Sequence, residues 1–289
     1  MAARFWPSPL ITRINESRQR AHIYLLGRQS PSGGFCFYRT DYLDEPSLFD
    51  TWHATTALGL LGGLPAHPEA LANFVCGQPP SGQLYELFYR TFTLDIFNIA
   101  DPDHMLVKEM VDALPLNLSD PTRHSALSGQ LERLLLTLQL KVHFGLTFII
   151  EEIAQIILGL EHMSGGFGTP PNLLDTRLTI RVLGLCGQTS STNTAAFVSQ
   201  MALPKFAFRL TQHSLAPTLE TVCAGIECCR VLNLPVAYLE DAASFILACQ
   251  VHNGGFARAP AALPDIGLTH LALQGLESLF EYTPIHGHN

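Results

Sequence analysis

Four acidic residues stand at the predicted starts of helices, where a carboxyl group has two possible roles. They are Asp50, Asp175, Glu220 and Asp265. In the first role, a carboxylate caps its helix by accepting free backbone N–H groups at the positive helix end. In the second, the carboxyl groups gather at one end of the molecule and exchange protons with a bound molecule. The sequence alone leaves both roles open.

These acids belong to a repeat. The tripeptide Gly-Gly-Phe occurs at residues 33–35, 165–167 and 254–256, and Asp175, Glu220 and Asp265 follow one another at intervals of 45 residues. A period of this length indicates a supersecondary unit that cannot bury its apolar face alone.

Helical periodicity identifies the unit as a hairpin of two helices. Ile153, Ile157 and Leu160 recur at helical spacing, and alternating runs typical of strands are missing. Counting such units predicts about six hairpins, or about twelve helices. The Gly-Gly-Phe repeats are clearest near residues 33–62, 165–187 and 254–281, and the pattern is degenerate between 66 and 143.

Composition excludes several classes of protein. The chain has 289 residues, 47% of them apolar, and a net charge of −8. It is therefore expected to be ordered, to bind no nucleic acid and to carry no polybasic membrane patch. No signal peptide is expected, because residues 1–13 lack the apolar core of one. No spanning helix is expected either, because Glu151 and Glu152 interrupt the most apolar run. The seven scattered cysteines, without a C-x-x-C pair, predict reduced thiols in a cytoplasmic protein.

Four segments around the acids carry recognisable motifs. Residues 175–179 read Asp-Thr-Arg-Leu-Thr and resemble D-T-R-F-S, and residues 219–224 resemble G-Y-T-F-C-A. Residues 254–265 resemble G-G-L-x-x-R-P followed by P-D-x-C, and residues 50–53 resemble D-x-x-H. Together they resemble the α/α-toroid superfamily of protein prenyltransferase β subunits and class II terpenoid cyclases. In that family the D-x-x-H repeat comes last, whereas here it comes first, within residues 33–62. The chain therefore resembles the same ring of hairpins with its two ends placed between a different pair of neighbouring hairpins.

The resemblance implies an all-α fold, an (α/α)6 toroid with inner and outer helix rings, as a single domain over residues 1–289. It also implies a central apolar cavity suited to an isoprenoid chain. Its expected aromatic lining comprises Trp52, Tyr85, Phe88 and Phe92. The alternative for each of these side chains is ordinary core packing.

In the prenyltransferases of this family, zinc is held by the Asp and Cys of P-D-x-C and by the His of D-x-x-H. The corresponding residues here are Asp265, Gly267 and His53, and glycine cannot bind a metal. A catalytic zinc needs three protein ligands. His270 is expected to lie more than one helical turn from Asp265. We therefore expect no cofactor, with zinc on His53 and Asp265 as the alternative. His53 is then either a buried, hydrogen-bonded side chain or a proton-transfer group.

The family's basic cluster for a diphosphate is only partly present. Arg258 keeps its arginine, but the two other mapped positions hold Ala262 and Pro217. Arg177 with Arg181, and Arg39 in the first loop, could rebuild an anion site. The alternative is that these arginines face solvent or pair with acids.

The D-x-D-D motif of class II cyclases is absent. We nevertheless expect acid–base cyclisation or isomerisation of an isoprenoid substrate, with a proton handled by Asp265, His53 and Asp50, and with Glu220 and Asp175 as further candidates. Trp52, Tyr85 and Phe88 would line the cavity, and the polar head group would be oriented by Arg39, Arg177 and Arg258. The alternatives are a zinc-dependent prenyltransferase β-like enzyme with a helical partner subunit and a non-catalytic lipid-binding toroid. A homodimer is also compatible with the sequence.

Overall fold

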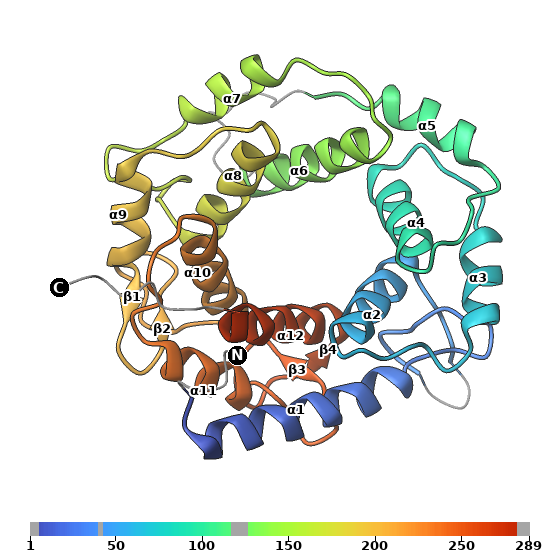
Figure 1. Cartoon of the computed structure of the whole chain (residues 1–289), viewed down its shortest axis with the longest axis horizontal. Helices are drawn as coiled ribbons and strands as arrows, with labels where there is room; N and C mark the ends of the chain where they lie inside the picture. The colour runs from blue at the N-terminus through green and yellow to red at the C-terminus, as the bar shows by residue number, and fades with distance from the viewer. Residues whose placement is uncertain (1–5, 40–42, 117–126, 282–289) are drawn as a thin grey trace.

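The computed structural model describes residues 6–39, 43–116 and 127–281, and over these residues it forms a closed ring of helices (Figure 1). The outer ring comprises α1 (Ser8–Leu26), α3 (Pro68–Cys76), α5 (His104–Asp112), α7 (Ile150–Leu158), α9 (Thr192–Gln200) and α11 (Leu239–Ala248). The inner ring comprises α2 (Leu48–Leu60), α4 (Leu84–Ile96), α6 (Leu127–His143), α8 (Leu173–Leu185), α10 (Leu219–Val231) and α12 (Ile266–Glu281). The predicted all-α toroid is confirmed. The predicted single domain over residues 1–289 extends beyond the described residues.

Successive inner helices pack side by side, and the last inner helix, α12, packs against the first, α2. Two short antiparallel ribbons lie in the connections. They are β1 (Ala202–Leu203) with β2 (Ala207–Phe208), and β3 (Phe256–Ala257) with β4 (Pro264–Asp265). The ring closure brings together residues from both ends of the chain (Figure 1).

The Gly-Gly-Phe turns hold the outer helices against one another. Gly33, Gly165 and Gly254 share a positive φ, of 105°, 90° and 94°. A Cβ atom on Gly254 would lie 2.3 Å from the carbonyl oxygen of Arg20 in α1. Only glycine permits this backbone conformation together with so close an approach. The third turn therefore docks on the first helix and closes the outer ring.

The phenylalanine of each turn fixes the start of the next inner helix. Phe35, Phe167 and Phe256 are fully buried. Their backbone N–H groups donate to a threonine hydroxyl one turn into that helix, and these contacts are Phe35 to Thr51 (3.0 Å), Phe167 to Thr176 (3.1 Å) and Phe256 to Thr269 (3.0 Å). Each loop is thus tied to the inner-helix end that it precedes.

Asp175, Glu220 and Asp265 are evenly spaced in the sequence, but they do not occupy the same position relative to the start of their helices. Asp265 precedes α12, and its Oδ1 accepts the N–H of Leu268 at 2.6 Å, which makes it the capping residue. The caps of α8 and α10 are Asn172 and Thr218. Asp175 and Glu220 therefore lie inside the first turn of their helices, and the three acids are not structurally equivalent.

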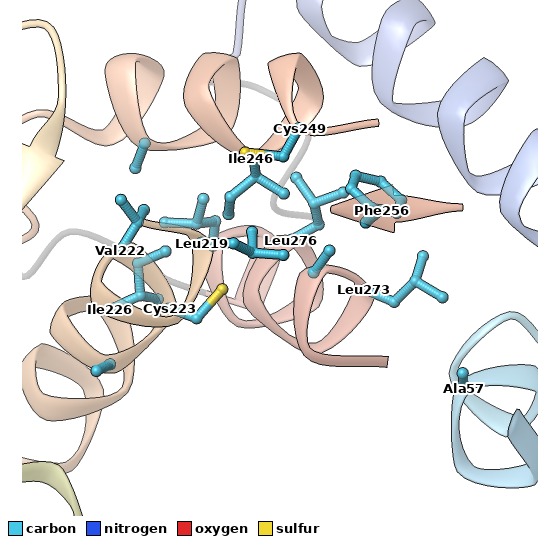
Figure 2. Close-up of a cluster of buried hydrophobic side chains, with 14 of the residues drawn as sticks. Ala57, Leu219, Val222, Cys223, Ile226, Ile246, Cys249, Phe256, Leu273 and Leu276 are labelled. Carbon is cyan, nitrogen blue, oxygen red and sulfur yellow. The ribbon is translucent and has the colours of Figure 1, made fainter. Parts of the chain in front are cut away.

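The core lies between the two rings. Figure 2 shows part of it, where side chains of α10, α11 and α12 meet Phe256 of β3. Leu219, Val222, Ile246, Leu273 and Leu276 are all buried there. Inner helices thus bury one face against the outer ring and present the other to the centre. Among the described residues, no helix is long and apolar enough to cross a membrane.

Candidate functional site

A cavity of about 580 Å³ lies in the centre of the ring. Its aromatic wall is formed by Phe49 and Trp52 of α2 and by Phe88 and Tyr89 of α4. The Trp52 ring lies 5.4 Å from the Phe88 ring and 5.5 Å from the Tyr89 ring, measured between centroids. These distances are typical of aromatic pairs that pack into a continuous apolar surface.

Two of the three aromatic side chains expected to contact substrate, Trp52 and Phe88, line the cavity, and Tyr85 does not. Tyr85 donates its hydroxyl to Glu132 Oε2 at 3.3 Å, and of these two residues only Glu132 lines the cavity. Phe92, also expected to line the cavity, instead contacts the His143 ring, at 5.3 Å. Tyr89 was not predicted, although it lies one helical turn after Tyr85 and therefore on the same helix face.

A pair of histidines lies on the cavity wall next to Trp52. His53 of α2 and His270 of α12 approach with their Nδ1 atoms 2.9 Å apart, across the seam where the ring closes. The Trp52 ring centroid is 4.6 Å from that of His53 and 5.4 Å from that of His270. The spacing of His270 from Asp265 along one helix gives no indication of this contact. The partner of His270 comes from the other end of the chain.

Burial keeps both rings neutral. It lowers the pKa of His53 to about 3, with a further contribution from His270. It lowers the pKa of His270 to about 4, and the nearby Arg181 guanidinium adds to this effect. Desolvation disfavours a charged imidazole, so the pair carries no positive charge at neutral pH. A neutral imidazole can accept a proton, which makes the pair a potential base.

This burial predicts how stability depends on pH. An unfolded histidine binds a proton below about pH 6.5, whereas the folded pair binds it only near pH 3 to 4. The free energy of unfolding should therefore fall as pH drops from 6.5 towards 4, by about 1.4 kcal/mol per pH unit for each histidine. Urea unfolding of the wild type and of the His53→Gln/His270→Gln variant measures this slope. An equally steep slope in the variant would contradict the assignment.

Asp265 lies beside this pair. A Cβ atom on Gly267 would lie 3.3 Å from Asp265 Oδ1 and 3.8 Å from His53 Nε2, so both side chains face the same point of the cavity wall. Burial raises the pKa of Asp265, the charges of Asp50 and Glu220 raise it further, and backbone N–H groups of residues 267 and 268 oppose the shift. A raised pKa keeps this carboxyl protonated to a higher pH than an exposed one.

The other candidate acids are held at the helix starts. Asp50 accepts the Ser47 hydroxyl at 2.8 Å, and burial raises the pKa of Asp50. Asp175 accepts the side-chain amide of Asn172 at 2.8 Å and the Ser128 hydroxyl. Neither aspartate lines the cavity. Each accepts a hydrogen bond from the side chain of the residue that caps its helix, Ser47 for Asp50 and Asn172 for Asp175. Glu220 does line the cavity.

The predicted arginines separate into two groups. Arg177 and Arg181 line the cavity and share one acid, Glu227, with N–O distances of 3.5 Å each. Two guanidinium groups thus face one carboxylate, and the buried Arg177 Nε has no hydrogen-bond partner among the described residues. Arg258 is exposed and pairs with Glu220 at 3.2 Å. Arg39 is exposed and donates to the carbonyl of Gln29, away from the cavity.

The residues do not fit a catalytic zinc. Asp265 and His53 could supply two ligands, but the third position is Gly267, and the His270 Nδ1 is engaged with His53. Within the described ranges, no group of three or more His, Cys, Asp or Glu side chains could hold a metal ion.

Comparisons with known proteins agree with this architecture. The model of the prenyltransferase alpha-alpha toroid domain family matches residues 139–286, just over half of the chain. Protein geranylgeranyltransferase-I from Candida albicans, complexed with GGPP, has a TM-score of 0.62 and 15% identity over 80% of this chain and 83% of its own. The type II terpene cyclase MstE from Scytonema, in complex with geranylgeranyl dihydroxybenzoate as substrate, has a TM-score of 0.60 and 12% identity over 95% of this chain and 99% of its own. At such identities the two structures show a shared fold alone. No curated protein sequence matches this chain.

Proposed function

Because this chain belongs to the family of prenyltransferase alpha-alpha toroid domains, we propose that it is an isoprenoid-processing enzyme that cyclises or isomerises its substrate by acid–base chemistry. The observation that carries this proposal is the position of Asp265, with its raised pKa, beside the neutral His53–His270 pair on the wall of an aromatic cavity. An acid and a base are thus available at one place.

The cavity supports an isoprenoid as substrate. Its volume of about 580 Å³ lies within the range of ligand pockets, about 300–1,000 Å³. Aromatic faces stabilise cations that lie against them, by about 2 kcal/mol when water is excluded. Trp52, Phe88 and Tyr89 could therefore shield a carbocation. Two structural neighbours hold geranylgeranyl compounds, as substrate in MstE and as GGPP in the Candida enzyme.

In the proposed reaction, Asp265 donates a proton to an alkene of the substrate. The raised pKa favours the protonated carboxyl that this step requires. Activity should accordingly fall as pH rises through the pKa of Asp265. The polar head group would lie near Arg177 and Arg181, where the positive charges outnumber the single carboxylate of Glu227. Arg258 would contribute only by holding Glu220 in place.

A zinc-dependent prenyl transfer is less well supported, because Gly267 removes the third ligand. A non-catalytic lipid-binding toroid predicts ligand binding without turnover. We also propose a cytoplasmic location, as the sequence predicts, since six of the seven cysteines are buried free thiols.

A panel of C20 isoprenoids distinguishes these functions. Geranylgeraniol, geranylgeranyl diphosphate and a geranylgeranyl phenol are incubated with the protein, and products are analysed by mass spectrometry. Cyclisation or isomerisation predicts a product with the mass of its substrate. Loss of diphosphate with transfer to an added peptide thiol would support prenyl transfer instead. Tight binding without any product would support the lipid-binding alternative.

Filling the cavity should prevent binding without harming the fold. Gly129 of α6 lines the cavity, and a Cβ atom there would contact nothing within 4 Å. A Gly129→Phe variant should bind geranylgeraniol at least about tenfold more weakly, while the helix gains about 0.3–0.5 kcal/mol from the replacement of glycine by phenylalanine. Fluorescence titration and thermal unfolding measure the two effects.

The matched control is Gly184→Phe. Gly184 is also a helical glycine with open space around it, but it lies outside the cavity lining. The control should bind geranylgeraniol as the wild type does. Equal affinity in both variants would show that the ligand does not occupy this cavity.

A further inference from the structure

The hydrogen bond between His53 and His270 determines which of their ring nitrogens can accept a proton in the cavity. Only one hydrogen can lie between the two Nδ1 atoms at 2.9 Å. When both rings are neutral, one ring therefore carries its hydrogen on Nδ1 and has a bare Nε2, and the other ring carries its hydrogen on Nε2. The pair always offers one Nε2 that can accept a proton.

We propose that the His53–His270 pair is the base that ends the reaction, so that the product is an alkene with the mass of its substrate and not an alcohol. The inference rests on the proposed function and extends it, because acid-initiated cyclisation can end either by loss of a proton or by addition of water. No sequence motif pointed to a role for His270.

The step balances without a further reactant. A C–H bond next to the carbocation breaks, and its electron pair forms the new C=C bond. The proton goes to the bare Nε2 of the pair, and the bridging hydrogen can move towards the second Nδ1, which spreads the positive charge over both rings. Asp265, which has lost its proton at the start, is then a carboxylate close enough to stabilise that charge.

The surroundings favour this base over water. His270 is buried, and Trp52 contacts both rings, so the pair lies against the aromatic wall where a cation would be held. The charged or titratable groups near the pair are Asp265 of β4, Arg181 of α8 and Tyr89 of α4. The positive charge of Arg181 disfavours a proton on His270. The positive charge is therefore better tolerated on His53, whose Nε2 lies near Asp265.

Glu132 is the rival base. Its carboxylate lines the cavity from α6 and accepts the Tyr85 hydroxyl at 3.3 Å. It is exposed, however, on a different wall of the ring from Trp52. A variant at this position separates the two assignments.

The experiment measures how the carbocation is quenched. Wild type, His53→Phe, His53→Asn and Glu132→Gln are each incubated with the C20 panel in ¹⁸O-labelled water. We expect the ratio of ¹⁸O-alcohol to alkene to rise at least about tenfold in both His53 variants, as for the loss of a general base. His53→Asn keeps a hydrogen-bonding partner for His270 but cannot accept a proton, so a merely structural role would be rescued in it. His143→Asn, which alters a histidine outside the cavity lining, is the control.

The outcomes distinguish a failure of this inference from a failure of the proposed function. An unchanged ratio in the His53 variants, with an isomer formed by the wild type, would overturn this inference alone. A rise only in Glu132→Gln would assign the base to Glu132 and would also overturn it. No product from the wild type with any panel member would overturn the proposed function, and the inference with it.

Discussion

The Asp265→Asn variant is expected to lose at least about 10³-fold in turnover with whichever panel compound the wild type converts. An amide is nearly the same size as the carboxyl group, but its N–H protons are far too weakly acidic to be given to an alkene. Binding should be retained, because the cavity and its aromatic wall are unchanged. Steady-state kinetics should therefore show a fall in kcat with little change in KM.

The same variant should fold normally. The carboxamide oxygen can still accept the N–H of Leu268, so α12 keeps its cap. Since folding raises the pKa of Asp265, the ionised carboxylate is less stable in the folded than in the unfolded protein above the unfolded-state pKa. Removing it should leave the melting temperature at pH 7 equal or slightly higher. Retained turnover would remove Asp265 from the proton-transfer step.

The Gly267→Cys variant is expected to acquire a metal site, changing the zinc content from none in the wild type to about one per chain. The Cβ position at residue 267 lies 3.8 Å from His53 Nε2 and 3.3 Å from Asp265 Oδ1. A thiolate there would complete a set of Cys, His and Asp ligands, with zinc–ligand distances of about 2.0–2.3 Å. Gly267 has no positive φ, so a side chain is compatible with its backbone.

Elemental analysis after dialysis checks the metal content, with Gly267→Ser and Gly267→Cys/His53→Ala as controls that should remain metal-free. The metal would occupy Asp265 and His53, so isomerisation should fall as zinc is taken up. Stoichiometric zinc in the wild type would contradict the inference that Asp265 and His53 lack a third zinc ligand. A zinc-free Gly267→Cys variant would show that Asp265 and His53 do not converge on residue 267.

The ring architecture could be predicted from the sequence because its determinants are local. Each Gly-Gly-Phe turn requires a positive φ at its first glycine, and helical periodicity on both sides indicates a hairpin. The register of the acids could not be read from their spacing. Loops of different length before α10 and α12 move Asp265 to the cap and place Glu220 within the first turn. Alignment on Thr51, Thr176 and Thr269, which bind the turn phenylalanines, would have given the correct register.

The site was only partly predictable, because its most important contact joins the two ends of the chain. His53 and His270 are 217 residues apart and meet only when α12 packs against α2. The available signal was the expected ring closure itself, which makes the first and last inner helices neighbours. Similarly, Tyr89 and not Tyr85 lines the cavity, although both lie on one face of α4. They differ by one turn along the helix, and the height of the cavity along α4 depends on how α4 packs against α2 and α6.

A crystal structure of the Asp265→Asn variant with bound geranylgeraniol tests most directly whether the ring encloses an isoprenoid site at these residues. The chain should lie in the central cavity along Trp52, with one alkene carbon within about 4 Å of the side chain at position 265. A ligand bound outside the ring, or a hydrocarbon chain remote from position 265 and from His53, would contradict the account.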